Sequence, residues 1–373
     1  MMMRRPSGVA TAALLAALIG SAGCSILMAR DPVFLTPDDW TRAIRERGVD
    51  PAGIPSPLET TDEMRAFAKE VAGGGSMFDR LTRIQGTMFD RAMFTIDQES
   101  PETLTAAEAF QRRRGNCVSF TNLFLALARS LGIQLQAGLV VQRESSEKKD
   151  DLVLVYTHMV AVVRFVKGFA IYDFFAASER RGAEIRLLDD MGLTGILVSN
   201  RGVAALRAHD YPLALWRFDA AVRLAPQFTG GWGNLGLARW RMGDTAGALA
   251  AYRRALAIDS HQPTVLNNLA AIYQSQGNVE SARTALAAAD LSFISPYSLI
   301  VRGDLELSFG NLKEALRQYR SARSLAPKSP DPLVAIARAE SARGNRDAAR
   351  EALEKALRLS PGDDVIRKLL KGF

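Results

Sequence analysis

The chain has 373 residues, of which 48% are hydrophobic and 23% are charged, and this balance excludes a disordered chain and allows two or three domains. Its two cysteines and three histidines exclude a disulfide-stapled scaffold and a zinc site built from four cysteines or from two cysteines and two histidines, so we expect no metal or other cofactor. The net charge is −1 over residues 1–194 and +8 over residues 195–373; we attribute the excess to arginines on solvated helix faces and expect no nucleic-acid partner.

Residues 1–24 have the organisation of a secretion signal. Arg4 and Arg5 precede an apolar run over residues 9–20, which is shorter than the roughly 20 residues of a membrane-spanning helix. Because it leads into Ala-Gly-Cys, the segment resembles a bacterial lipoprotein signal peptide. The resemblance implies a lipid anchor on Cys24 and a place in the bacterial cell envelope, with Ser25 favouring the periplasmic side of the outer membrane. The alternative is an ordinary signal peptide with no role for Cys24.

The next segment, residues 25–75, is rich in residues that interrupt regular structure. It contains five prolines and ends in three consecutive glycines at 73–75. This composition predicts an extended tether with short helices near residues 38–47 and 61–71. Residues 76–113 are expected to be helical, with an apolar stripe that indicates core packing.

A helix with a cysteine in its first turn is predicted after Gly115-Asn116. Its apolar residues fall on one face: Phe120, Leu123, Phe124, Leu127 and Leu131. A helix N-terminus stabilises an anion through its dipole and its free N–H groups, which favours a thiolate. Cys117 is therefore the candidate nucleophile, and a small buried core residue is the alternative interpretation.

Three strand-like runs follow, over residues 135–143, 152–165 and 169–175. His158 lies in the second run and Asp173 in the third. In an antiparallel hairpin with an even-length loop, paired positions sum to an odd number, so these two side chains point to the same face of the sheet. We therefore expect the Asp173 carboxylate to be within reach of the His158 imidazole.

The stretch Gly115-x-Cys117, with Leu123, Arg129 and Gly132-Ile133 behind it, resembles the nucleophile helix of the transglutaminase-like superfamily. His158 and Asp173 complete its Cys-His-Asp order, although Val160 stands where an aromatic residue is often found. The resemblance covers residues 76–190 and implies an α+β domain, similar to cysteine proteases, with Cys117, His158 and Asp173 as catalytic residues. The superfamily includes cross-linking enzymes, peptidases, amidases and inactive members.

The C-terminal half is an array of repeats of about 34 residues. Five aligned segments begin at alanines 33 or 34 residues apart: Ala214, Ala248, Ala282, Ala315 and Ala349. A small residue stands twelve positions before each of them: Gly202, Gly236, Ala270, Gly303 and Ala337. Small residues let two helices cross closely, and a large residue four positions after each aligned alanine fills the groove: Phe218, Tyr252, Leu286, Tyr319 and Leu353.

This pattern resembles the tetratricopeptide repeat (TPR). The resemblance covers residues 195–361 and implies five repeats in an all-α solenoid, with residues 362–373 as a capping helix. The family binds peptides or partner proteins, so the array is expected to recruit a protein substrate or partner. We further expect that residues 195–373 can be removed without loss of Cys117 reactivity.

From these observations we predict an envelope-anchored enzyme that transfers acyl groups from peptide or protein amides through a Cys117 thioester. Hydrolysis, as by a peptidase or amidase, is favoured over cross-linking by a transglutaminase, because nothing in the chain marks an amine-binding site. The backbone N–H of Cys117 is one expected oxyanion donor. Asn116, Gln85 and Tyr156 remain candidates for the second. The rival hypothesis is a non-catalytic TPR adaptor with a relic transglutaminase-like domain.

Overall fold

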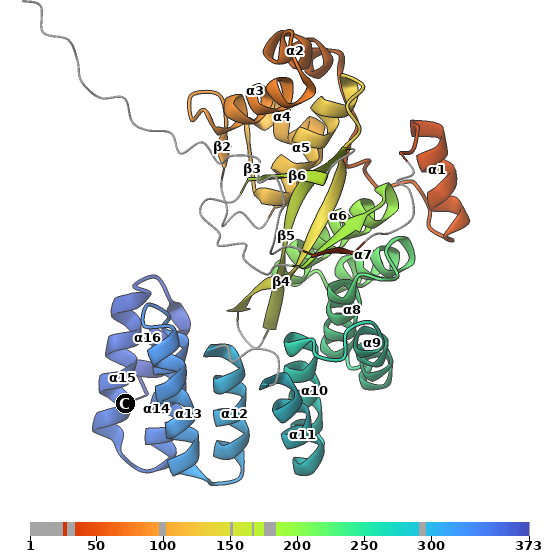
Figure 1. The fold of residues 1–373 in the computed structure, drawn as a ribbon. Coiled ribbons are helices and arrows are strands. Elements are labelled where there is room, and N and C mark those ends of the chain that lie inside the picture. The colour runs from red at the N-terminus through yellow and green to blue at the C-terminus, as the bar shows by residue number, and fades with distance from the viewer. Residues whose placement is uncertain are drawn as a thin grey trace, which may run out of the picture.

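The computed structural model describes residues 25–27, 34–96, 102–149, 152–165, 168–174, 184–290 and 296–372. The N-terminal half combines helices with a sheet, and the C-terminal half is a curved row of helices (Figure 1). This is the predicted order of an α+β domain followed by an all-α solenoid. Cys24 and the rest of the predicted signal peptide lie outside the described residues.

The first helix, α1 (Pro37–Glu46), is packed against the start of the array and is not part of an extended tether. Ile44, Val49 and Ile54 share a buried cluster with residues of the array. The Trp40 Nε1–H donates a hydrogen bond of 3.1 Å to Thr194 Oγ1. The two short helices predicted near residues 38–47 and 61–71 are present at Pro37–Glu46 and Asp62–Ala72. The prediction of an extended tether was wrong, because apolar residues of this segment pack into buried clusters.

Four further helices form the core of the N-terminal half: α2 (Asp62–Ala72), α3 (Met77–Phe89), α4 (Ala106–Arg112) and α5 (Cys117–Ser130). In α5 every residue from Val118 to Ala128 is buried. This helix packs against α2, α3 and α4 and against the sheet. It is therefore the central helix of the domain, and its first residue is Cys117.

Among the described residues, the main sheet has five strands in the order β1-β7-β4-β5-β6. They are β1 (Ser25–Leu27), β4 (Gln136–Lys149), β5 (Leu152–Phe165), β6 (Gly168–Asp173) and β7 (Glu184–Leu188). Strand β1 is parallel to β7, and the other pairs are antiparallel. A small parallel pair, β2 (Thr95–Ile96) and β3 (Arg114–Gly115), precedes α5. The three predicted strands are thus confirmed as β4, β5 and β6.

In the described part of the array there are five antiparallel helix pairs and one final helix. The pairs are α6 (Asp190–Arg207) with α7 (Tyr211–Leu224), α8 (Thr229–Arg241) with α9 (Thr245–Ile258), α10 (Pro263–Ser275) with α11 (Val279–Asp290), α12 (Pro296–Ser308) with α13 (Leu312–Leu325) and α14 (Asp331–Ala342) with α15 (Arg346–Leu359). The final helix is α16 (Asp364–Leu370). Strand β5 lies against α8 and α10, and β4 lies against α12, so the long hairpin reaches the array.

The predicted close crossing of paired helices is confirmed at the glycines. A Cβ atom on Gly202 would lie 2.6 Å from the Phe218 ring, and one on Gly236 would lie 2.5 Å from the Tyr252 ring. A Cβ atom on Gly303 would likewise lie too close to the Tyr319 ring. Each glycine thus leaves room for the aromatic ring of the partner helix, which is fully buried in all three pairs.

We predict that Gly236→Ala destabilises the protein, because the Tyr252 ring must shift to make room for the new methyl group. Overpacking of this kind costs about 1–3 kcal/mol. The matched control is Gly86→Ala in α3, where a Cβ atom meets nothing within 4 Å and the higher helix propensity of alanine adds up to about 1 kcal/mol. Urea denaturation followed by circular dichroism measures both, and a Gly236→Ala protein as stable as the wild type would contradict the prediction.

Candidate active site

Cys117 is the first residue of α5, as predicted. The preceding residue, Asn116, is the N-cap, with φ −82° and ψ −179°, and its Oδ1 accepts a hydrogen bond of 3.0 Å from the Ser119 N–H. The thiol of Cys117 is free and only partly buried. Cys117 therefore lies at the positive end of a helix whose following turns are buried in the core.

Gly115 explains why the chain can enter this helix so tightly. A Cβ atom at residue 115 would lie 2.6 Å from the Cβ of Ser119, in the first turn of α5. That distance is too short for two carbon atoms, so any other residue would push the backbone away from the helix. Glycine is therefore required for the approach that places Cys117.

Strands β5 and β6 bring His158 and Asp173 together. Val160 is the residue opposite Asp173, so the paired positions sum to an odd number and His158 lies on the same face, as predicted. The Nε2 atom of His158 lies 3.1 Å from each oxygen of the Asp173 carboxylate. His158 is 8% exposed and Asp173 is 2% exposed, which shields their interaction from water.

The imidazole of His158 also contacts Cys117, which completes a Cys-His-Asp chain. Burial alone lowers the pKa of His158, but hydrogen bonds to Asp173 and to Cys117, together with the negative charges of both partners, outweigh burial and raise this pKa to about 9. Because Asp173 engages Nε2, Nδ1 is the ring nitrogen left for the thiol. The ring is thus protonated at neutral pH, which is the state that pairs with a thiolate.

Strand β4 is irregular next to this site. Val140 pairs with His158, whereas Ser145 pairs with Tyr156, so the register shifts between these positions. Between these two pairs β4 therefore has more residues than β5, and this irregularity lies directly before His158. Bulges of this kind bend a strand and redirect its side chains, and they are common beside active sites.

The structure assigns structural roles to two of the three candidates for a second oxyanion donor. The Asn116 amide donates to the Glu102 carbonyl and to Thr103 Oγ1, both at 3.2 Å. The buried Gln85 amide, from α3, donates a hydrogen bond of 3.3 Å to the Asp173 carbonyl. Asn116 is therefore a helix cap and Gln85 supports the strand end that carries Asp173. The side chain of Tyr156 lies outside the described part of the chain.

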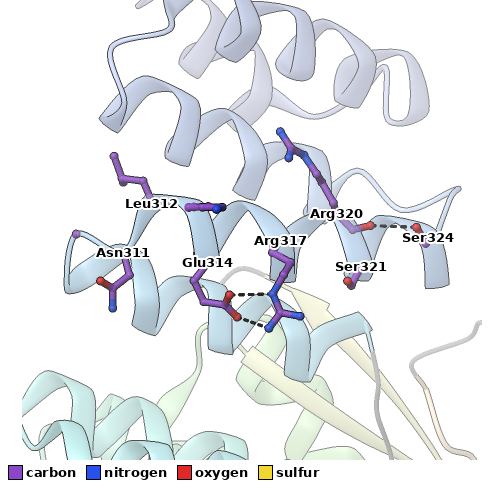
Figure 2. A pocket seen from close by; sticks show the side chains of 9 residues that line it. Asn311, Leu312, Glu314, Arg317, Arg320, Ser321 and Ser324 are labelled. Atoms are coloured by element: carbon purple, nitrogen blue, oxygen red, sulfur yellow. Dashed lines mark hydrogen bonds and ion pairs between the residues drawn. The ribbon is translucent and has the colours of Figure 1, made fainter.

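Two other features of the described residues do not contribute to this site. Those residues contain no group of three His, Cys, Asp or Glu side chains placed to bind a metal ion. A hollow on α13 is lined by residues between Gly310 and Ser324, with Glu314 paired to Arg317 (Figure 2). This hollow belongs to the array, whereas Cys117, His158 and Asp173 lie on α5, β5 and β6.

Comparison with known families agrees with both halves of the architecture. The model of the transglutaminase-like superfamily matches residues 65–174, and tetratricopeptide repeat models match residues 200–263, 239–293 and 306–371. The chain therefore contains a transglutaminase-like domain followed by tetratricopeptide repeats. The first match begins inside the segment that we predicted as a tether, in agreement with the packing of α2. Tetratricopeptide repeats support a role in protein–protein interaction.

Individual relatives match part of the chain. A stretch of 64 residues is 41% identical to the Hsp70-Hsp90 organizing protein of Triticum aestivum, over 17% of this chain and 11% of that protein, so the chain spans about a tenth of this curated relative. The Cut9–Hcn1 hetero-tetramer of APC/C is 20% identical, with coverage of 47% of this chain and 35% of that chain and a TM-score of 0.43. A thermophilic TPR protein of Thermus thermophilus is 21% identical, with coverage of 48% and 97% and a TM-score of 0.45.

We predict that the imidazole of His158 titrates with a midpoint near 9 and is protonated below it. Asp173→Asn removes the charged partner, so the midpoint falls toward the ordinary value of about 6.5. NMR of selectively labelled histidine measures this in a chain with three histidines, and His158→Gln assigns the signal. A wild-type midpoint near the ordinary value would contradict the prediction.

Proposed function

We propose that this protein is a cysteine-dependent enzyme that transfers acyl groups from peptide or protein amides, and that water is the usual acceptor. The observation that carries the proposal is the chain of contacts from Cys117 through His158 to Asp173, with a separation of 3.1 Å between imidazole and carboxylate. A thiolate, a proton donor and an orienting carboxylate are the groups that such a reaction requires.

The reaction proceeds in two steps. The Cys117 thiolate attacks the amide carbonyl carbon, and the oxyanion that forms is stabilised by free N–H groups at the start of α5. The His158 imidazolium gives its proton to the departing amine as the C–N bond breaks, which leaves a thioester. Water, deprotonated by the now neutral imidazole, attacks the thioester, releases the acid and restores the thiolate.

The alternative acceptor is an amine, as in a cross-linking transglutaminase. Both reactions use the same thioester, and they differ only in the nucleophile of the second step. Water is favoured because it is abundant.

The array supports the recruitment of a protein or peptide. Strand β5, which carries His158, also lies against α8 and α10. A polypeptide held by these helices is therefore close to the strand that supplies the catalytic histidine. The charge of +8 over residues 195–373 favours a partner with acidic groups.

A lipid anchor at Cys24 would hold the enzyme in the bacterial cell envelope. The support for this part of the proposal is the sequence alone, with its charged start, its apolar run and its Ala-Gly-Cys ending. Among the described helices, none has the length and apolar character that a membrane span requires.

We predict that iodoacetamide alkylates Cys117 rapidly at about pH 6, because the residue lies at the start of α5 and its side chain contacts the His158 imidazole. His158→Ala should slow the reaction by about 100-fold or more, since an ordinary thiol is almost entirely protonated at this pH. His209→Ala, at an exposed turn of the array, is the matched control. Peptide mass spectrometry locates and times the label. Equal, slow labelling of the wild type and His158→Ala would favour the non-catalytic adaptor.

We predict that hydrolysis dominates when a peptide library is incubated with the protein and a primary amine in water. Mass spectrometry distinguishes a new acid from an amine adduct on the same peptide, and Cys117→Ala is the inactive control. Amine adducts in excess over acids would reverse the assignment in favour of cross-linking.

A further inference from the structure

Residues 102–105, which we call the linking segment, form hydrogen bonds both with the nucleophile helix α5 and with α6, the first helix of the array. At its centre is Thr103, which is 2% exposed. The Thr103 hydroxyl oxygen accepts a hydrogen bond of 3.2 Å from the amide of Asn116 and another of 3.2 Å from the amide of Asn200. One buried hydroxyl thus connects the cap of α5 to a residue of α6.

Arg201, the next residue of α6, holds the same segment from the same side. Its Nε–H donates a hydrogen bond of 3.3 Å to the Thr103 carbonyl. The Nη2 atom of the same guanidinium forms an ion pair with Glu108. The Glu108 carboxylate in turn accepts a hydrogen bond of 2.8 Å from the Thr105 N–H. Arg201 therefore fixes the linking segment at two points.

The linking segment is in turn bonded to the first two turns of α5. The Leu104 N–H donates to Ser119 Oγ at 2.8 Å, and the Asn122 amide donates to the Leu104 carbonyl at 3.0 Å. Ser119 is also the residue whose N–H and hydroxyl bond the Asn116 side chain. The start of α5 is thus held through the linking segment by α6.

From these contacts we infer that Asn200 and Arg201, in the first helix of the array, are positioning residues for the Cys117 nucleophile. They act through Thr103, which orients the Asn116 cap and with it the first turn of α5. The inference rests on the proposed function for its effect on reactivity. It assigns the array a second role, in which the helices that bind a partner also complete the support of the active site.

This inference changes the expected result of removing the array. Helix α6 begins at Asp190, and its Leu193 and Ile196 lie in the same buried cluster as α5. A deletion of residues 195–373 therefore cuts α6 and removes Asn200 and Arg201. The sequence-based expectation that Cys117 reactivity survives this deletion does not fit the structure, so the test must use the full chain.

The decisive variant is Thr103→Val, which keeps the shape of the side chain and removes the shared hydroxyl. We expect alkylation of Cys117 at about pH 6 to slow about tenfold, the factor that corresponds to leaving the Asn116 and Asn200 amide donors without their buried acceptor. Amide hydrogen exchange of residues 117–120 should accelerate by a similar factor. Arg201→Met should act in the same direction, and it decides the question if Thr103→Val fails to fold.

Two controls separate positioning from general stability. Thr103→Ser keeps the hydroxyl and should retain wild-type alkylation and exchange. Arg338→Met breaks another ion pair of the array, with Asp304, and should leave both measurements unchanged. Unchanged alkylation and exchange in Thr103→Val, or an equal loss in Arg338→Met, would overturn the inference. A wild-type Cys117 that does not react would instead refute the proposed function, and the exchange rates would still decide the inference.

Discussion

The hydrogen bond between the His158 imidazole and the Asp173 carboxylate joins two neighbouring strands inside the protein. Burial by itself lowers the pKa of the imidazole, and the contact with Asp173 makes the largest of the contributions that raise it. The register of β5 and β6 produces the contact, and the buried helix α5 delivers Cys117 to it. Both the sheet and helix α5 must therefore be folded before the Cys117 thiol can contact His158.

Much of this arrangement could be predicted from the sequence, because it follows from local periodicity. The helical spacing of apolar residues located the start of α5, and the alternation of strand side chains placed His158 and Asp173 on one face. The repeat spacing indicated the glycine and aromatic pairs of the array. Predicting these features requires only the positions of residues along the chain and the period of the helix, strand or repeat. It does not require knowledge of how distant segments pack.

The features that sequence reasoning missed all depend on long-range packing. Asn116 and Gln85 were considered as oxyanion donors because their side-chain amides carry N–H groups. In the structure the Asn116 amide donates to Thr103 and the Gln85 amide to the Asp173 carbonyl, and both partners are distant along the chain. The proline-rich segment looked like a tether, yet its residues Ile44, Val49 and Ile54 pack against α6 and α7. A capping signal was present for Asn116, because asparagine is among the residues preferred immediately before the first turn of a helix.

The two-cysteine composition has a chemical consequence once the thiols are placed. With a lipid on Cys24, as proposed, Cys117 has no resolving cysteine in its own chain. An oxidant that converts the thiolate to sulfenic acid would then find no internal thiol with which to form a disulfide, and further oxidation to sulfinic acid is irreversible. The partly exposed sulfur would depend on a thiol reductant supplied from outside the chain for its recovery.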